Sequence, residues 1–104
     1  MQDEIAYKLL KSIEENPSQS QRDLSVSLGI SLGKLNYCLK ALIDKGLVKA
    51  GNFRKNPQKQ DYLYLLTPQG IEEKAKVTRR FLKRKVKDYE ELKREIEELQ
   101  KETV

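Results

Sequence analysis

Apolar residues in the first part of the chain recur every three or four positions, which predicts amphipathic helices. In the first of these stretches Ile5, Leu9 and Ile13 share one face. We expect Asp3 to cap this helix. The Asn-Pro pair at 16–17 ends it, because the residue before a proline avoids the α region of the backbone.

Two more helices follow, joined by a tight turn. Ser18 or Ser20 opens the second helix, and Ser20 with Asp23 three residues further on resembles a capping box. Gly29 ends that helix, because glycine readily adopts a left-handed backbone conformation. Ser31 caps the third helix and Gly46 ends it. The buried stripe of this third helix consists of Leu35, Leu39, Leu42 and Ile43.

The period then changes to the alternation that is typical of β-strands. Residues 47–53, LVKAGNF, and 61–67, DYLYLLT, are short and rich in strand-forming side chains. The segment between them, RKNPQKQ, is polar and basic, and its Asn-Pro pair suits the tip of a hairpin. Thr67 then caps a final helix, with Pro68 at the first helical position.

This final helix is predicted to be long. After Gly70 it contains neither glycine nor proline, and its apolar spacing alternates between four and three, which indicates a coiled-coil seam. A helix over residues 68–101 measures roughly 50 Å, too long to bury its stripe against so small a domain. We therefore expect its distal half to pair with a second copy. The expected dimer interface comprises Ile71, Ala75, Thr78, Phe81, Leu82, Lys85, Val86, Tyr89, Leu92, Ile96 and Leu99.

Charge is segregated along the same helix. Residues 72–87 hold eight basic and two acidic side chains, whereas residues 88–102 hold three basic and seven acidic ones. A parallel pair would place like halves together, so we predict an antiparallel coiled coil. The alternative is a single long helix that folds back on its own domain.

Composition excludes several kinds of site. The 104 residues carry a net charge of +5, which suits a polyanionic partner. There is no histidine and only one cysteine, so His-based metal sites, Ser-His triads and CxxC pairs are absent. We expect Cys38 to be a small core or interface residue. No signal peptide or run of ~20 apolar residues is evident, so we expect a cytoplasmic protein without a membrane partner.

A pair of helices joined by a glycine turn and followed by a basic hairpin is the layout of a winged helix-turn-helix. The predicted fold is mainly α with a small β-hairpin: a winged helix-turn-helix domain over residues 1–67, followed by a long C-terminal coiled-coil helix over 68–104. An α-helix fits the major groove, so the recognition helix 31–45 would read bases and the wing 53–60 would meet the backbone or minor groove. The candidate DNA-binding residues are Gln21, Arg22, Ser31, Leu32, Gly33, Lys34, Asn36, Tyr37, Lys40, Arg54, Lys55 and Lys59.

Side-chain chemistry suggests a role for several of these residues. Asn36 can bond base edges, with a preference for adenine, and Lys34 or Lys40 can meet guanine or phosphate. Tyr37 can reach a phosphate, and Gly33 leaves room for close approach. Each residue has a simpler interpretation, since a lone exposed lysine or asparagine is usually just solvated and a tyrosine can pack half-buried. The prediction therefore depends on the combination: the polar residues share one outward side of the helix, and a basic wing follows.

Two segments resemble the MarR-type winged-helix transcriptional regulators: residues 24–52, LSVSLGISLGKLNYCLKALIDKGLVKAGN, and residues 62–70, YLYLLTPQG. The resemblance covers residues 3–70 and is nearest to the small MarR-like regulators associated with bacterial exopolysaccharide gene clusters. It implies a homodimeric repressor or activator that binds a pseudo-palindromic operator.

The chain departs from this family in two ways. The acidic-Arg pair common at the wing is missing, which shifts weight to Arg54 and Lys55. One long helix replaces the several helices that form the dimer base and ligand pocket, which argues against a small-molecule effector.

The predicted function is therefore a sequence-specific DNA-binding transcriptional regulator that acts as a homodimer, with double-stranded DNA and a second copy as partners. The alternative is a winged-helix module for protein–protein interaction, with a coiled-coil tail and no specific DNA binding. We predict neither enzymatic activity nor a cofactor, because no nucleophile–base pair is evident and the carboxylates cluster in the helix tail at spacings that keep them solvated.

Overall fold

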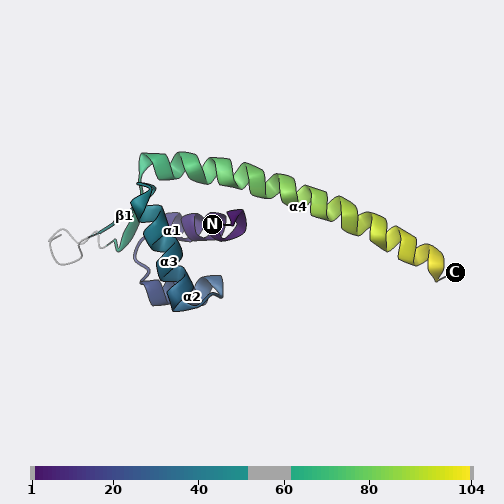
Figure 1. The fold of residues 1–104 in the computed structure, drawn as a ribbon, viewed down its shortest axis with the longest axis horizontal. Coiled ribbons are helices and arrows are strands. Elements are labelled where there is room, and N and C mark those ends of the chain that lie inside the picture. Colours follow the sequence, from purple (N-terminus) through teal and green to yellow (C-terminus); the bar gives the residue numbers. More distant parts are fainter. Residues whose placement is uncertain (1, 52–61, 104) are drawn as a thin grey trace.

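A long helix that projects far beyond a small globular domain dominates the computed structural model, which describes residues 2–51 and 62–103 (Figure 1). The elements in chain order are α1 (Asp3–Glu15), α2 (Gln21–Leu28), α3 (Leu32–Asp44), β1 (Val48–Ala50), β2 (Tyr64–Leu66) and α4 (Pro68–Glu102). The described part measures 68 × 25 × 23 Å along its principal axes. The predicted mainly α fold with a small antiparallel hairpin is confirmed.

Local capping signals set the ends of the helices. The Ser20 hydroxyl accepts a hydrogen bond from the Asp23 amide, and the Asp23 carboxylate accepts one from the Ser20 amide, both at 3.1 Å. These bonds form the predicted capping box, and the amide of Ser20 holds the pKa of Asp23 below its usual value. Gly29 then ends α2 with a φ of 69°, and the Ser31 hydroxyl caps α3 by accepting from the Lys34 amide.

The predicted cap of α1 is wrong. Gln2 occupies the N-cap position without a side-chain bond, and Asp3 is the first helical residue. The Asp3 carboxylate accepts hydrogen bonds from Nε of Arg80 at 3.1 Å and from Nη2 at 3.2 Å. Arg84 lies 3.7 Å from the same carboxylate. A guanidinium that occupies both carboxylate oxygens is a stronger partner than a single backbone amide, so Asp3 turns towards α4.

Three helices and the sheet enclose one hydrophobic core. Its fully buried side chains are Leu9, Leu10, Ile13, Leu24, Leu35 and Leu39. Leu42 and Cys38 are also buried, so the predicted stripe of α3 and the predicted core cysteine are confirmed, while Ile43 is only partly buried. Each such large apolar side chain contributes about 1.5–3 kcal/mol through its removal from water.

A backbone junction sets the direction in which α4 leaves the domain. The Thr67 amide donates to the carbonyl of Leu47 at 3.0 Å, and the Thr67 hydroxyl donates to the carbonyl of Gly46 at 2.6 Å. The same hydroxyl accepts from the Gly70 amide at 3.0 Å, which confirms the predicted cap. Gly70 is buried against Leu47, and a Cβ at position 70 would collide with the Leu47 carbonyl oxygen.

The proximal part of α4 packs along α1. Val77 is buried there, and the ring of Phe81 stacks on Tyr7 with the centroids 5.2 Å apart. Lys74 pairs with Glu14 at 2.6 Å. The structure thus places Phe81, a predicted dimer residue, against its own domain, and it adds Val77, which lies outside the predicted seam. The alternative prediction, a single long helix that folds back on its own domain, therefore fits this proximal part of α4.

The bond between Asp3 and Arg80 makes stability depend on pH. The Arg80 guanidinium holds the pKa of Asp3 below its usual value, and Asp3 raises the pKa of Arg80. Because the pKa of Asp3 is lower in the folded than in the unfolded chain, the pair stabilises the fold above the unfolded value, near 3.9, and this contribution is lost as the pH falls through the folded value. Urea unfolding should show Asp3→Asn to be less stable than the parent at pH 7, with the gap closing at acid pH.

Glu15→Gln, at the opposite end of α1, is the matched control. It should cost nothing at pH 7, since a negative charge at a helix C-terminus is unfavourable. A difference between Asp3→Asn and the parent that persists unchanged to acid pH would contradict the assignment.

Candidate nucleic-acid interface

Helix α3 turns one face to the core and the opposite face to solvent. Leu35, Leu39 and Leu42 define the buried side. At 100° per residue, the positions on the opposite side are 33, 36, 37, 40 and, in the last turn, the exposed Asp44, all within an arc of about 100°. We call Gly33, Asn36, Tyr37 and Lys40 the outward strip, and all four are exposed. Tyr37 is 76% exposed, which excludes a half-buried packing role within the domain.

The start of α3 adds three residues beside the outward strip. Leu32 is 45% exposed, and Lys34 is also exposed. The Ser31 hydroxyl is engaged with the Lys34 amide at 3.1 Å. Ser31 therefore fixes the first turn of the helix and the position from which Leu32 and Lys34 project.

Nothing in the packing of the described chain requires glycine at position 33. A Cβ built on Gly33 meets no heavy atom within 4 Å. Glycine inside a helix costs roughly 0.5–1 kcal/mol relative to alanine. Glycine at position 33 therefore lowers the stability of the helix and leaves open space at the N-terminal end of the outward strip.

The first turn of α2 presents a second set of exposed side chains. Arg22 is exposed and Gln21 is half-buried. Val26 is 77% exposed and lies on the same face as Arg22, because residues four apart are neighbours on a helix. The hydrophobic pattern missed Val26, since a single valine on the polar side of a short helix produces no periodic signal.

The predicted wing residues Arg54, Lys55 and Lys59 lie outside the described residues. Their contacts with DNA stay a prediction.

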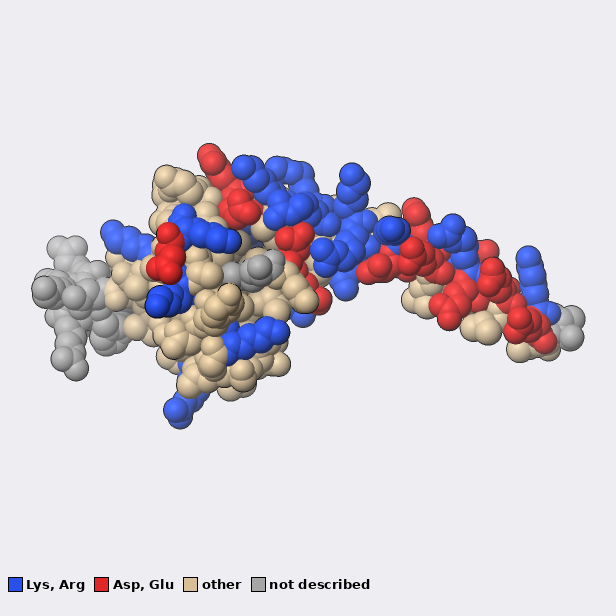
Figure 2. Space-filling view, viewed as in Figure 1, with Lys and Arg blue, Asp and Glu red and all other residues tan. Residues whose placement is uncertain are grey.

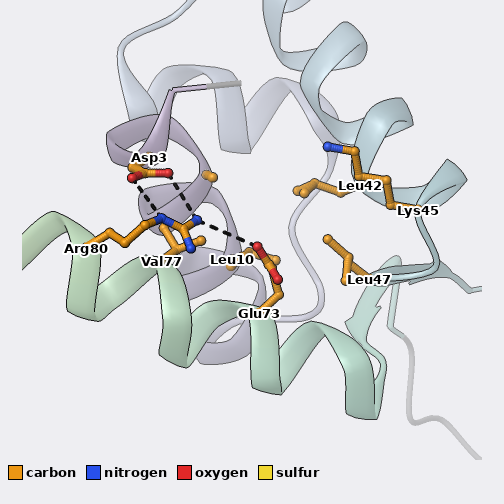
Figure 3. A pocket seen from close by; sticks show the side chains of 9 residues that line it. Asp3, Leu10, Leu42, Lys45, Leu47, Glu73, Val77 and Arg80 are labelled. Carbon is orange, nitrogen blue, oxygen red and sulfur yellow. Dashed lines mark hydrogen bonds and ion pairs between the residues drawn. The ribbon is translucent and has the colours of Figure 1, made fainter.

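A cavity of about 280 Å³ lies where α4 passes α1 and the end of α3 (Figure 3). Leu10, Leu42 and Val77 supply its apolar wall. Three of the four charged residues that line it bind one another, since Arg80 contacts Asp3 at 3.1 Å and Glu73 at 3.7 Å, and Lys45 is the fourth. The cavity therefore belongs to the junction between α4 and the domain.

Other kinds of site find little support in the described chain. Within residues 2–51 and 62–103 there is no group of three or more side chains suited to a metal ion. Every buried side-chain nitrogen or oxygen there has a hydrogen-bond partner. None of the helices in this part of the chain has both the length and the apolar character of a membrane span.

Comparison with known proteins agrees with this geometry. A family model described as a winged helix-turn-helix DNA-binding domain matches residues 2–49. Among solved structures, MarR from Staphylococcus aureus, in complex with salicylate and kanamycin, is similar with a TM-score of 0.55 and 24% sequence identity. The match covers 78% of this chain and 54% of that chain, so the present chain spans about half the length of that protein. No curated protein matches the sequence. The described chain therefore has a winged helix-turn-helix fold like that of MarR, and residues 2–49 are similar to DNA-binding domains of this type.

Proposed function

We propose that the chain is a sequence-specific DNA-binding transcriptional regulator that acts as a homodimer. The outward strip of α3 is the observation that carries the proposal. Its side chains are exposed although the opposite face of the same helix is fully committed to the core. In a winged helix-turn-helix, this helix enters the major groove, whose width accommodates an α-helix.

The chemistry of the strip suits a mixture of base and phosphate contacts. Asn36 can form a bidentate pair with adenine, and Lys40 can reach guanine or a phosphate. Leu32 offers an apolar contact to a thymine methyl group. The Tyr37 hydroxyl suits a phosphate or sugar, and its exposed ring adds contact area.

The remaining candidates position the domain on the backbone. Lys34 flanks the strip, and Gln21 and Arg22 on α2 would cross the phosphates beside the groove. On the wing, Arg54, Lys55 and Lys59 would neutralise phosphates or enter the adjacent minor groove. Such contacts fix the register of the protein without reading sequence, and they make binding sensitive to salt.

In this proposal, residues 1–67 bind DNA and residues 68–104 join two copies. The distal part of α4 exposes large apolar side chains, with Tyr89 at 64% and Leu92 at 54%. A partner helix would remove them from water. Dimerisation also makes the second half-site contact intramolecular, which raises the overall affinity without any new contact.

Substitutions on the outward strip test the proposal directly. Loss of a good base contact costs about 1–3 kcal/mol, roughly 5- to 150-fold in affinity. Asn36→Ala and Tyr37→Ala should therefore weaken binding to DNA from beside the protein's own gene, measured by gel shift at two salt concentrations. Binding to unrelated DNA should persist, whereas Lys55→Ala should weaken both to a similar extent.

Gln69→Ala is the matched control, because Gln69 is an exposed carboxamide at the start of α4, outside the strip. Unchanged operator affinity in Asn36→Ala and Tyr37→Ala would show that another face binds DNA. The lack of any specific complex at low salt would favour the protein-interaction module instead.

Gly33→Ala separates a functional loss from a folding loss. The added methyl group meets open space, so the free energy of unfolding should rise by up to about 1 kcal/mol. The same methyl group would lie between the helix and the groove floor, so operator affinity should fall at least tenfold. Urea unfolding and gel shift on one preparation measure both quantities.

Gly70→Ala is the contrasting variant, since its Cβ would collide with the Leu47 carbonyl and stability should fall by about 1–3 kcal/mol. If Gly33→Ala gains stability and keeps full operator affinity, close approach at Gly33 is refuted.

A further inference from the structure

Helix α4 carries two separate apolar faces. The first, around Val77 and Phe81, packs on α1. The second holds the large apolar residues Ile71, Leu82, Val86, Tyr89, Leu92, Ile96 and Leu99, which are between 46% and 64% exposed. At 100° per residue, positions 71, 82, 89 and 96 lie about 100–140° around the helix from Val77. Docking on α1 therefore leaves the second face open along the whole helix.

We propose that a second copy of this chain covers this face in an antiparallel coiled coil whose two-fold axis passes beside residue 87. The inference rests on the proposed homodimer and adds to it an orientation and a register. We call its central line the seam: Ile71, Ala75, Thr78, Leu82, Lys85, Tyr89, Leu92, Ile96 and Leu99.

Charge complementarity selects the orientation. Residues 72–87 carry eight basic and two acidic side chains, a net +6, and residues 88–102 carry three basic and seven acidic, a net −4. Figure 2 shows this division, with blue side chains gathered on α4 near the domain and red ones towards its tip. With the axis beside residue 87, the basic half of each helix lies along the acidic half of the other.

Pairing along the seam agrees with the same register. Four layers form, with Ala75 facing the partner's Leu99, Thr78 facing the partner's Ile96, Leu82 facing the partner's Leu92 and Lys85 facing the partner's Tyr89. Each polar seam residue thus meets an apolar or aromatic one. A parallel pair would instead place Lys85 beside the partner's Lys85, two like charges at the same level of the seam.

The two polar seam residues already have their polar atoms engaged within the chain. Thr78 donates its hydroxyl to the carbonyl of Lys74 at 2.6 Å, which leaves its methyl group for the seam. The ammonium of Lys85 lies 5.2 Å from the centroid of the Phe81 ring, so its aliphatic stem can cover the partner's tyrosine. Near the axis, Asp88 of one copy lies beside Asp88 of the other, which is unfavourable. The complementary net charges of the two halves of α4 therefore favour this arrangement, although not every individual pair does.

The register determines how far apart the two domains lie. Each domain docks on α4 between Gly70 and Phe81. In the antiparallel pair the centres of the two docking segments are about 23 residues apart, or roughly 35 Å along the coiled coil. One turn of B-DNA measures ~34–36 Å. The two docking segments would therefore be separated by about the spacing of adjacent half-sites.

Distances between spin labels in the full chain test the inference. Lys87 and Lys101 are both exposed and lie two heptads apart, so they occupy equivalent positions facing away from the seam. We would label Lys87→Cys and Lys101→Cys separately in a Cys38→Ala background that retains its thermal unfolding transition. The antiparallel register predicts about 20 Å between labels at 87 and about 45 Å between labels at 101.

The other outcomes overturn the inference. Short distances at both positions would show a parallel pair, and about 37 Å or about 55 Å at position 101 would show a register shifted by one heptad in one direction or the other. If neither position gives a measurable distance between chains, the dimer does not form. Gel shift on the same labelled samples tests the proposed function separately. An antiparallel dimer that forms no specific DNA complex would refute the proposed function alone. A specific DNA complex together with short distances at position 101 would refute this inference alone.

Discussion

The contact between Gly70 and the backbone of Leu47 is the constraint that sets the arrangement of the whole molecule. It lets α4 begin directly beside the turn after α3, where Thr67 binds the carbonyls of Gly46 and Leu47. Val77, Phe81 and the pair of Asp3 with Arg80 then hold the next turns of α4 on α1. The direction of the long helix, and with it the position of any partner, is thus fixed relative to the recognition helix.

This constraint explains why one helix can serve two purposes. The face around Val77 joins the domain, and the face around Leu82 and Tyr89 stays exposed for a partner. The two faces are separated by a third of a turn or slightly more around the helix, so one contact does not exclude the other. Helix α3 divides its surface in the same way, with Leu35 and Leu39 in the core and Asn36 and Tyr37 outside. In both helices the exposed residues add little to the stability of the single chain, which is consistent with a role in binding.

Much of the fold could be predicted because its signals are local. The capping box of Ser20 and Asp23, the left-handed turn at Gly29 and the start of α4 at Thr67–Pro68 each depend on a few adjacent residues. The pairing of Asp3 with Arg80 could not be predicted, because it joins residues 77 positions apart and an acidic residue at a helix start also suits a cap. Periodicity placed Phe81 on the apolar side of α4 but carried no information about which neighbour it would meet, and it stacks on Tyr7. Val26 could not be singled out before the structure showed how exposed it is, and for Gly33, which was predicted to leave room for close approach, the structure adds that a Cβ would meet open space.

In the proposed antiparallel dimer, α4 places the docking segments of two winged domains about one turn of B-DNA apart, and the two domains should together read an inverted repeat in DNA. Selection of binding sites by the full chain from a random double-stranded library is the sharpest test of this expectation, because the operator need not be identified beforehand. We expect enrichment of an inverted repeat whose half-site centres lie about 10–10.5 base pairs apart. Enrichment of a single half-site or a direct repeat, or no enriched sequence at all, would contradict it.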